Sequence, residues 1–147
     1  MKYIYTAIVL IISFWSCKSD FEDVPMEFVT VAEGSQYSTT ISDTSRQFLL
    51  IVNDIHWESI KSNIVIGAVS EPEINFSNHS LLAVIDRIQP NDQYGLKIKK
   101  VTEKEDDIVV NTEFTAPHDT LVIPPLVTRP FHIVKVAKSY KPVAFRK

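Results

Sequence analysis

The chain's four histidines are the residues best suited to bind a metal ion: His56, His79, His118 and His132. Metal-binding pairs on a helix or a ribbon stand roughly two to four residues apart, and no two of these histidines are that close. We therefore predict no metal site. We place His56 on the flank of a helix, His79 and His118 in turns, and His132 on the face of a strand.

Hydrolytic chemistry has equally little support in the sequence. A serine nucleophile elbow is built from glycines, and the chain has only Gly34, Gly67 and Gly95 and no Gly-x-Ser-x-Gly motif. The paired acids Glu71/Glu73 and Asp106/Asp107 stand beside a proline or in a predicted hairpin tip. Because a catalytic acid needs a buried environment that raises its pKa, we expect these pairs to be solvated. The sequence predicts a protein that is not an enzyme and needs no cofactor.

Composition removes further classes of protein. Lysine and arginine total 15 against 18 aspartates and glutamates, giving a net charge of -3, and no basic block could follow a phosphate backbone. We expect no nucleic acid partner. The single cysteine excludes an internal disulfide and any multi-thiolate metal site. With 45% hydrophobic and 10% aromatic residues, the sequence is typical of a folded globular domain.

That cysteine ends an apolar N-terminal segment. Lys2 is followed by the uncharged run Ile4–Trp15 and then by Ser16 and Cys17, the layout of a secretory signal. The run is shorter than the roughly 20 residues that span a membrane. Phe14-Trp15-Ser16-Cys17 resembles a bacterial lipobox, which implies cleavage before Cys17 and its lipidation. The alternative for Cys17 is an ordinary buried thiol.

Three segments follow from this interpretation. Residues 1–16 form a lipoprotein signal peptide, 17–27 a lipidated cysteine with an acidic spacer, and 28–147 a single β-rich domain. Acids directly after a lipidated cysteine resemble sorting signals that place some lipoproteins on the cell surface. We therefore expect a lipid-anchored protein of the bacterial cell envelope, at the outer membrane, with its periplasmic or surface face left open.

From Phe28 onward, short β-branched and aromatic runs alternate with turn residues. Strands are predicted at 28–31, 47–52, 80–88, 94–101, 108–114, 131–136 and 143–145, with 74–77 leading into the third. We expect 33–44 to be a loop, 103–107 a hairpin tip, 47–52 a strand buried on both faces, and 80–88 the central strand.

One helix is predicted, around Asp54–Ile64. Asn53 or Asp54 would cap it, and Trp57, Ile60 and Ile64 recur at helical spacing, with Trp57 facing the core. Prolines between residues 117 and 130 exclude a helix there. The expected fold is mainly β, a β-dominated α+β domain built as an antiparallel β-sandwich or open barrel.

The loop Gln89–Gly95 joins the two best predicted strands. It contains Asn91 and Asp92, followed by Tyr94, an aromatic side chain next to the flexible Gly95. These four residues are the candidate partner contact. The alternative is a simple turn with Tyr94 packed onto the sheet.

Four features together resemble a known family. They are Asp54-x-x-Trp57, Ile74-Asn75-Phe76, Tyr94-Gly95 and the closing run Thr128–Val136 (TRPFHIVKV). Over residues 47–145 the chain resembles the C-terminal domain of the protease complex subunit PrcB family. The resemblance implies a non-catalytic accessory lipoprotein that binds and stabilises a secreted or surface peptidase complex. The chain departs at Asn91–Gly95, where the family commonly has a Thr-Gly-Gly-Tyr loop.

Two other functions stay open. A peptidase inhibitor-like β domain would suppress protease activity, whereas an accessory subunit would preserve it. A surface glycan-binding lipoprotein would need Trp57, Tyr37 or Tyr94 exposed as a sugar platform. Asp119-Thr120-Leu121 also resembles a bacterial O-glycosylation motif, which makes Thr120 a candidate modification site.

Overall fold

The computed structural model of the chain describes residues 21–38, 45–70, 73–117 and 126–147. Within these ranges it has one helix, two sheets and nine strands. The four-stranded sheet has the order β1-β6-β7-β9, and the five-stranded sheet the order β3-β5-β8-β2-β4. The elements are β1 (Val24–Met26), β2 (Phe28–Tyr37), β3 (Gln47–Ile51), α1 (Asp54–Lys61), β4 (Ile64–Val69), β5 (His79–Ile85), β6 (Gly95–Glu103), β7 (Ile108–Thr115), β8 (Phe131–Ala137) and β9 (Val143–Arg146).

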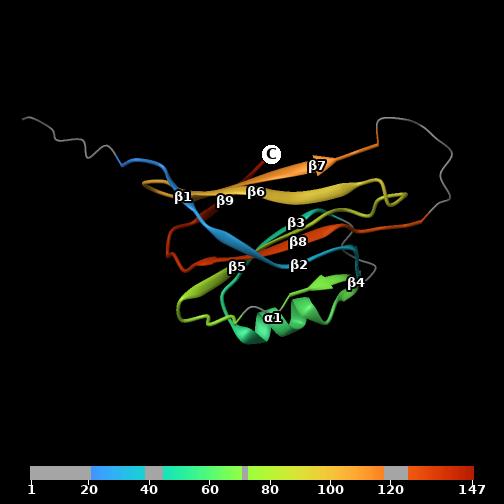
Figure 1. Ribbon diagram of the computed structural model, residues 1–147, viewed down its shortest axis with the longest axis horizontal. Helices are drawn as coiled ribbons and strands as arrows, with labels where there is room; N and C mark the ends of the chain where they lie inside the picture. The colour runs from blue at the N-terminus through green and yellow to red at the C-terminus, as the bar shows by residue number, and fades with distance from the viewer. Residues whose placement is uncertain (1–20, 39–44, 71–72, 118–125) are drawn as a thin grey trace, which may run out of the picture.

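These elements form three layers (Figure 1). Helix α1 covers one face of the five-stranded sheet, and the four-stranded sheet packs on the other face. All strand pairs are antiparallel except β7 with β9. The predicted β-dominated α+β fold with one short helix is confirmed.

Strand β5 shows why the most hydrophobic run of the domain is uninterrupted. Leu81, Ala83 and Ile85 join the cluster on the helix side. Leu82 and Val84 join the cluster between the sheets. Since successive side chains point to opposite faces, a strand covered on both faces has no solvent-facing position and favours apolar residues throughout. The prediction that 80–88 is the central strand was wrong: β5 ends at Ile85 and lies next to β8, which takes the central place in the sheet.

The helix begins as predicted and ends earlier. The side chain of Asn53 caps it by accepting a hydrogen bond from the His56 N–H at 2.8 Å, and Trp57 is buried. The predicted end at Ile64 was wrong, because the helix stops at Lys61 and Ile64 opens β4, paired with β2. The β-branched residues after the helix favour this pairing over another helical turn.

Two predictions about strands were also wrong. The expected loop at 33–44 is a strand as far as Tyr37, because β2 pairs with β8 on one side and β4 on the other; residues 39–44 lie outside the described part. The run 47–52 is not buried on both faces. It forms the edge strand β3, where Phe48 is 42% and Leu50 40% exposed, because the four-stranded sheet does not fully cover that edge.

Of two smaller predictions, one about a hairpin tip is confirmed and one about a histidine is wrong. The predicted hairpin tip at 103–107 is confirmed, with the Lys104 N–H donating to the Asp107 carbonyl at 2.8 Å. His79 begins β5 instead of lying in a turn, because the turn closes just before it with the His79 N–H donating to the Asn75 carbonyl.

The N-terminal segment corrects the predicted spacer 17–27. Val24–Met26 is strand β1, paired with Glu103–Val101 of β6. One residue later, Glu27, the chain leaves the four-stranded sheet, and β2 enters the five-stranded sheet. A strand that switches sheets in this way makes a corner of a β-sandwich. It also leaves the first half of β6 without a neighbour on the β1 side among the described residues.

Gly67 is required where β4 packs against β2 and against the ring of Phe131 from β8. A Cβ added at this residue would lie 2.7 Å from Cζ of Phe131 and 2.7 Å from the Glu33 carbonyl oxygen. Neither atom can withdraw easily, because Phe131 is 1% exposed and the second atom is backbone.

We therefore expect Gly67→Ala to lower the free energy of unfolding by about 1–3 kcal/mol through overpacking. Gly95→Ala is the matched control, because its Cβ would meet only Thr115 Cβ, at an ordinary 3.5 Å. Urea unfolding followed by tryptophan fluorescence measures both. Equal stability of the two variants would contradict this packing.

Candidate functional site

A hollow of about 740 Å³ opens where β2 diverges from β6. Glu33 and Gly34 of β2 and Gly67 of β4 form one wall, and Gly95 and Lys97 of β6 form the other. Gly34, Gly67 and Gly95 are all the glycines of the sequence, so each wall brings backbone without a side chain to the hollow. Pro130 and Phe131 of β8 also line it.

Two of the four predicted contact residues belong to this hollow. Tyr94 and Gly95 line it, and Tyr94 is half-buried. Asn91 and Asp92 are not among its lining residues. Asn91 shapes the turn instead: its Oδ1 accepts from the Gln93 N–H at 3.0 Å and its carbonyl accepts from the Thr128 hydroxyl at 2.8 Å. Asp92 is exposed to solvent.

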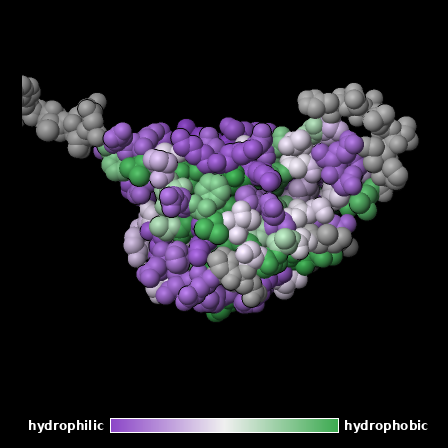
Figure 2. Space-filling model, in the orientation of Figure 1, coloured by the Kyte–Doolittle hydropathy of each residue, from purple (hydrophilic) through white to green (hydrophobic). Residues whose placement is uncertain are grey.

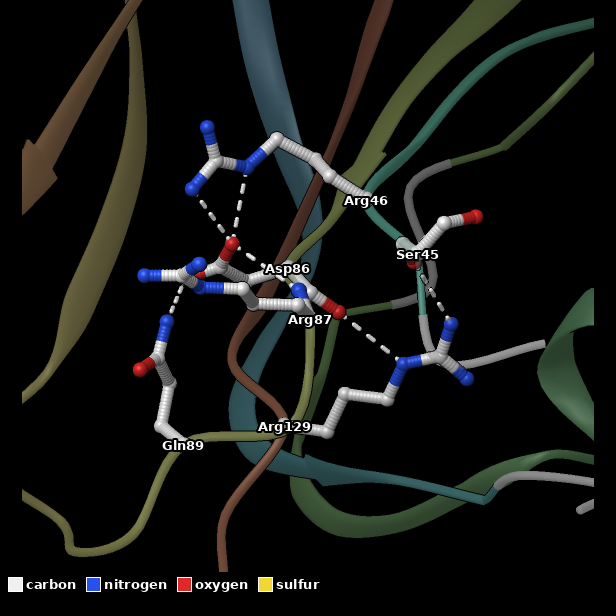
Figure 3. Close-up of polar contacts among 6 residues, drawn as sticks. All are labelled: Ser45, Arg46, Asp86, Arg87, Gln89 and Arg129. Carbon is white, nitrogen blue, oxygen red and sulfur yellow. Dashed lines mark hydrogen bonds and ion pairs between the residues drawn. The ribbon is translucent and has the colours of Figure 1, made fainter.

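A buried carboxylate anchors the start of this turn (Figure 3). Asp86, 2% exposed, lies at the end of β5. Its Oδ1 accepts from Arg46 Nε and from the Arg87 N–H at 2.7 and 2.9 Å, and its Oδ2 accepts from Gln89 Nε2 at 2.7 Å. A carboxylate withdrawn from water is stable only with such partners. The chain after β5 is thereby fixed in direction.

The second cation of this cluster, Arg129, bonds to backbone rather than to the carboxylate (Figure 3). Its Nε donates to the Asp86 carbonyl at 2.9 Å, and its terminal nitrogens donate to the carbonyls of Ser38 and Ser45 at 3.4 and 3.3 Å. The guanidinium also lies 5.6 Å from the centre of the Tyr37 ring. One buried side chain thus joins segments from three parts of the sequence.

The cluster reaches the hollow through the turn between β5 and β6. Gln89 and Thr128 exchange backbone hydrogen bonds at 2.8 and 3.0 Å, which pins the turn against the segment leading into β8. Sequence reasoning did not single out Asp86, Arg46 or Arg129. The available signal was a charged residue directly after five apolar ones at the end of β5, since a buried charge requires partners.

His132 joins the two sheets behind the hollow. Its Nδ1 accepts from the Ile98 N–H of β6 at 2.9 Å, so its Nε2 carries the proton, 3.0 Å from the Thr30 hydroxyl. The ring is 2% exposed, and burial lowers the pKa of His132, opposed by Glu33 and assisted by Lys97. The prediction that it lies on a sheet face is confirmed.

Other chemistry-bearing residues are dispersed. In the part of the chain that the structure describes, no three histidine, cysteine, aspartate or glutamate side chains are grouped so that they could hold a metal ion. Two of the aromatics considered for sugar binding, Trp57 and Tyr37, are buried at 6% and 7% exposure. Cys17, His118 and Thr120 lie outside the described residues.

The comparisons add no relative. No family model, no curated protein and no solved structure matches the chain. No described helix is long and apolar enough to cross a membrane.

The His132 link predicts a pH dependence of stability. Because its pKa in the folded protein lies below the ordinary value of 6.5, the unfolded chain takes up the proton first as the pH falls. Stability is retained above about pH 6.5 and falls below it, with a slope of at most about 1.4 kcal/mol per pH unit. Urea unfolding between about pH 7.5 and about pH 5.5 measures this slope.

His132→Asn keeps an acceptor for the Ile98 N–H and removes the titration. It should be less stable at neutral pH and show a shallower slope, whereas His56→Gln should keep the wild-type slope. An unchanged slope in His132→Asn would show that another group is responsible.

The buried carboxylate gives a second prediction. Asp86→Asn should lower the free energy of unfolding by about 2–4 kcal/mol, because it removes the charge that Arg46 and Gln89 surround. The exposed Asp92→Asn should change it by less than about 0.5 kcal/mol. Urea unfolding of both variants is the measurement, and similar midpoints would show that the Asp86 cluster is dispensable.

Proposed function

We propose that the chain is a lipid-anchored, non-catalytic binding protein of the bacterial cell envelope that associates with and stabilises a secreted or surface peptidase complex. The observation that carries the binding role is the hollow beside the half of β6 that, among the described residues, has no strand on its β1 side, with Tyr94 and Gly95 in the wall of the hollow. An exposed strand edge beside an open groove is a common protein-binding surface.

The remaining parts of the proposal come from the sequence. The peptidase partner rests on the resemblance to the PrcB family, and the anchor rests on Cys17 behind its apolar segment. Two of the three described histidines support a binding role rather than a catalytic one, because His132 is committed to structural hydrogen bonds and His79 accepts a bond from the Asn75 N–H.

The first experiment is an affinity purification of the full-length protein from its native membranes in mild detergent, followed by mass spectrometry and a protease assay. We expect a peptidase to co-purify and its activity to be preserved or raised by added protein. Suppressed activity would favour the inhibitor-like function, and recovery of the lipoprotein without a peptidase would reject the proposal.

Two variants test the lipid anchor and the partner contact separately: Cys17→Ser removes the lipidation site, and Tyr94→Ala removes the aromatic side chain of the hollow. Cys17→Ser should release the protein from membranes while leaving partner binding intact. Tyr94→Ala should weaken co-purification, whereas Asn78→Ala, in the exposed turn before β5, should not. A membrane-bound Cys17→Ser protein would refute lipidation at this residue.

A further inference from the structure

The edge of β6 that borders the hollow is already used as a pairing surface. β6 pairs along its length with β7, but on its other side β1 pairs only with Val101–Glu103. The stretch Gly95–Lys100 continues the same edge, with no strand beside it in the described ranges. It ends where the chain switches sheets at Glu27.

The direction of the backbone groups on this edge follows from one hydrogen bond. The Ile98 N–H points away from β7, since it donates to His132 of the other sheet. In an antiparallel pair the N–H and C=O of alternate residues point the same way, so those of Leu96, which lines the hollow, also point away from β7. His132 already occupies the edge at Ile98, so the part that can accept another extended chain is the stretch before it, Gly95–Lys97.

The glycines leave room for such a chain. In the described part no glycine has a positive φ, so backbone conformation does not demand glycine at 95. Packing does not demand it either, because an added Cβ would meet only Thr115, at 3.5 Å or more. The bare backbone of Gly95 and Gly34 across the hollow instead lets another backbone approach closely.

Charge indicates what that chain carries. β6 presents Lys97, Lys99 and Lys100, all exposed. The upper side of the molecule, where β6 and β7 lie in Figure 1, is largely hydrophilic in Figure 2. Glu113 pairs with Lys99 at 2.6 Å, and Glu33 lies 3.8 Å from Lys97, so the cations outnumber these acids. The occupant already on this edge is itself acidic: Asp23, just before β1, pairs with Lys104 at 2.6 Å.

We infer that an extended, acidic segment of a partner protein adds to β6 along Gly95–Lys97, within the hollow and on the same side of β6 as β1. Its backbone pairs with Leu96 and its acids face Lys97, which lines the hollow. This deepens the proposed function, on which it rests for the existence of a partner, by naming the mode of binding and the chemistry of the bound segment.

The test uses full-length protein in mild detergent and three labelled octapeptides, followed by fluorescence anisotropy. The first alternates glutamate and valine, the second lysine and valine, and the third is the acidic peptide N-methylated at alternate residues. We expect saturable binding of the acidic peptide and affinities weaker by about tenfold or more for the other two. Equal binding of the three, or no binding of the acidic one, would overturn the inference.

Variants locate the binding. Gly95→Val fills the hollow from the β6 wall and should weaken the acidic peptide by about tenfold, whereas Ala137→Val, an exposed strand position outside the hollow, should not. Lys97→Glu is a second variant, which adds no side chain at Gly95. It should reduce the ratio of the affinity for the acidic peptide to the affinity for the lysine peptide. Unchanged binding in correctly folded Gly95→Val, or an unchanged preference in Lys97→Glu, would reject this site.

The same variants separate this inference from the proposed function. If a peptidase co-purifies equally with wild-type and Gly95→Val protein, the peptidase partner is supported and this binding mode is rejected. If the acidic peptide binds as expected and no peptidase co-purifies, the binding mode is supported and the peptidase partner is rejected.

Discussion

The buried carboxylate of Asp86 is the constraint around which one end of the domain is organised. Taken out of water, it requires hydrogen bonds, and it obtains them from Arg46, Gln89 and the Arg87 N–H. Its own carbonyl accepts from Arg129, which also holds the carbonyls of Ser38 and Ser45. The end of β5, the approach to β3 and the entry to β8 are therefore fixed relative to one another, and the turn that begins the wall of the hollow is fixed with them.

A second constraint comes from the switch of the chain between sheets. β1 and β2 are separated by Glu27 alone, yet they belong to different sheets. Because the chain changes sheets there, β1 pairs with β6 only at Val101–Glu103, and the other end of β6 borders the hollow and its glycine-bearing walls. His132 compensates on the inside by supplying the acceptor for Ile98 that a neighbouring strand would otherwise provide. The hollow thus borders the part of β6 that β1 does not reach.

The run Thr128–Val136, on which the family resemblance chiefly depends, has a structural explanation for each unusual residue. Arg129 holds three carbonyls, Phe131 packs beneath Gly67, and His132 links the sheets. Strand propensity alone would not select an arginine, an aromatic and a histidine in this order. Their shared requirement is to join β8 to its surroundings, so the resemblance concerns the architecture more directly than it concerns a binding surface.

The sequence alone determined the class of fold, because β-branched runs, turn residues and one capped helix are local signals. It also determined the absence of a recognisable catalytic motif and singled out Tyr94 and Gly95. It could not determine that Ile64–Val69 leaves the helix to form an edge strand, that β2 continues through Gly34, or that Val24–Met26 pairs with β6. Those outcomes depend on partners distant in sequence. Only the tertiary structure decided that three scattered glycines share one hollow and that Asp86 and Arg129 meet, because such contacts are selected by packing and by the cost of burying charge, neither of which a local pattern records.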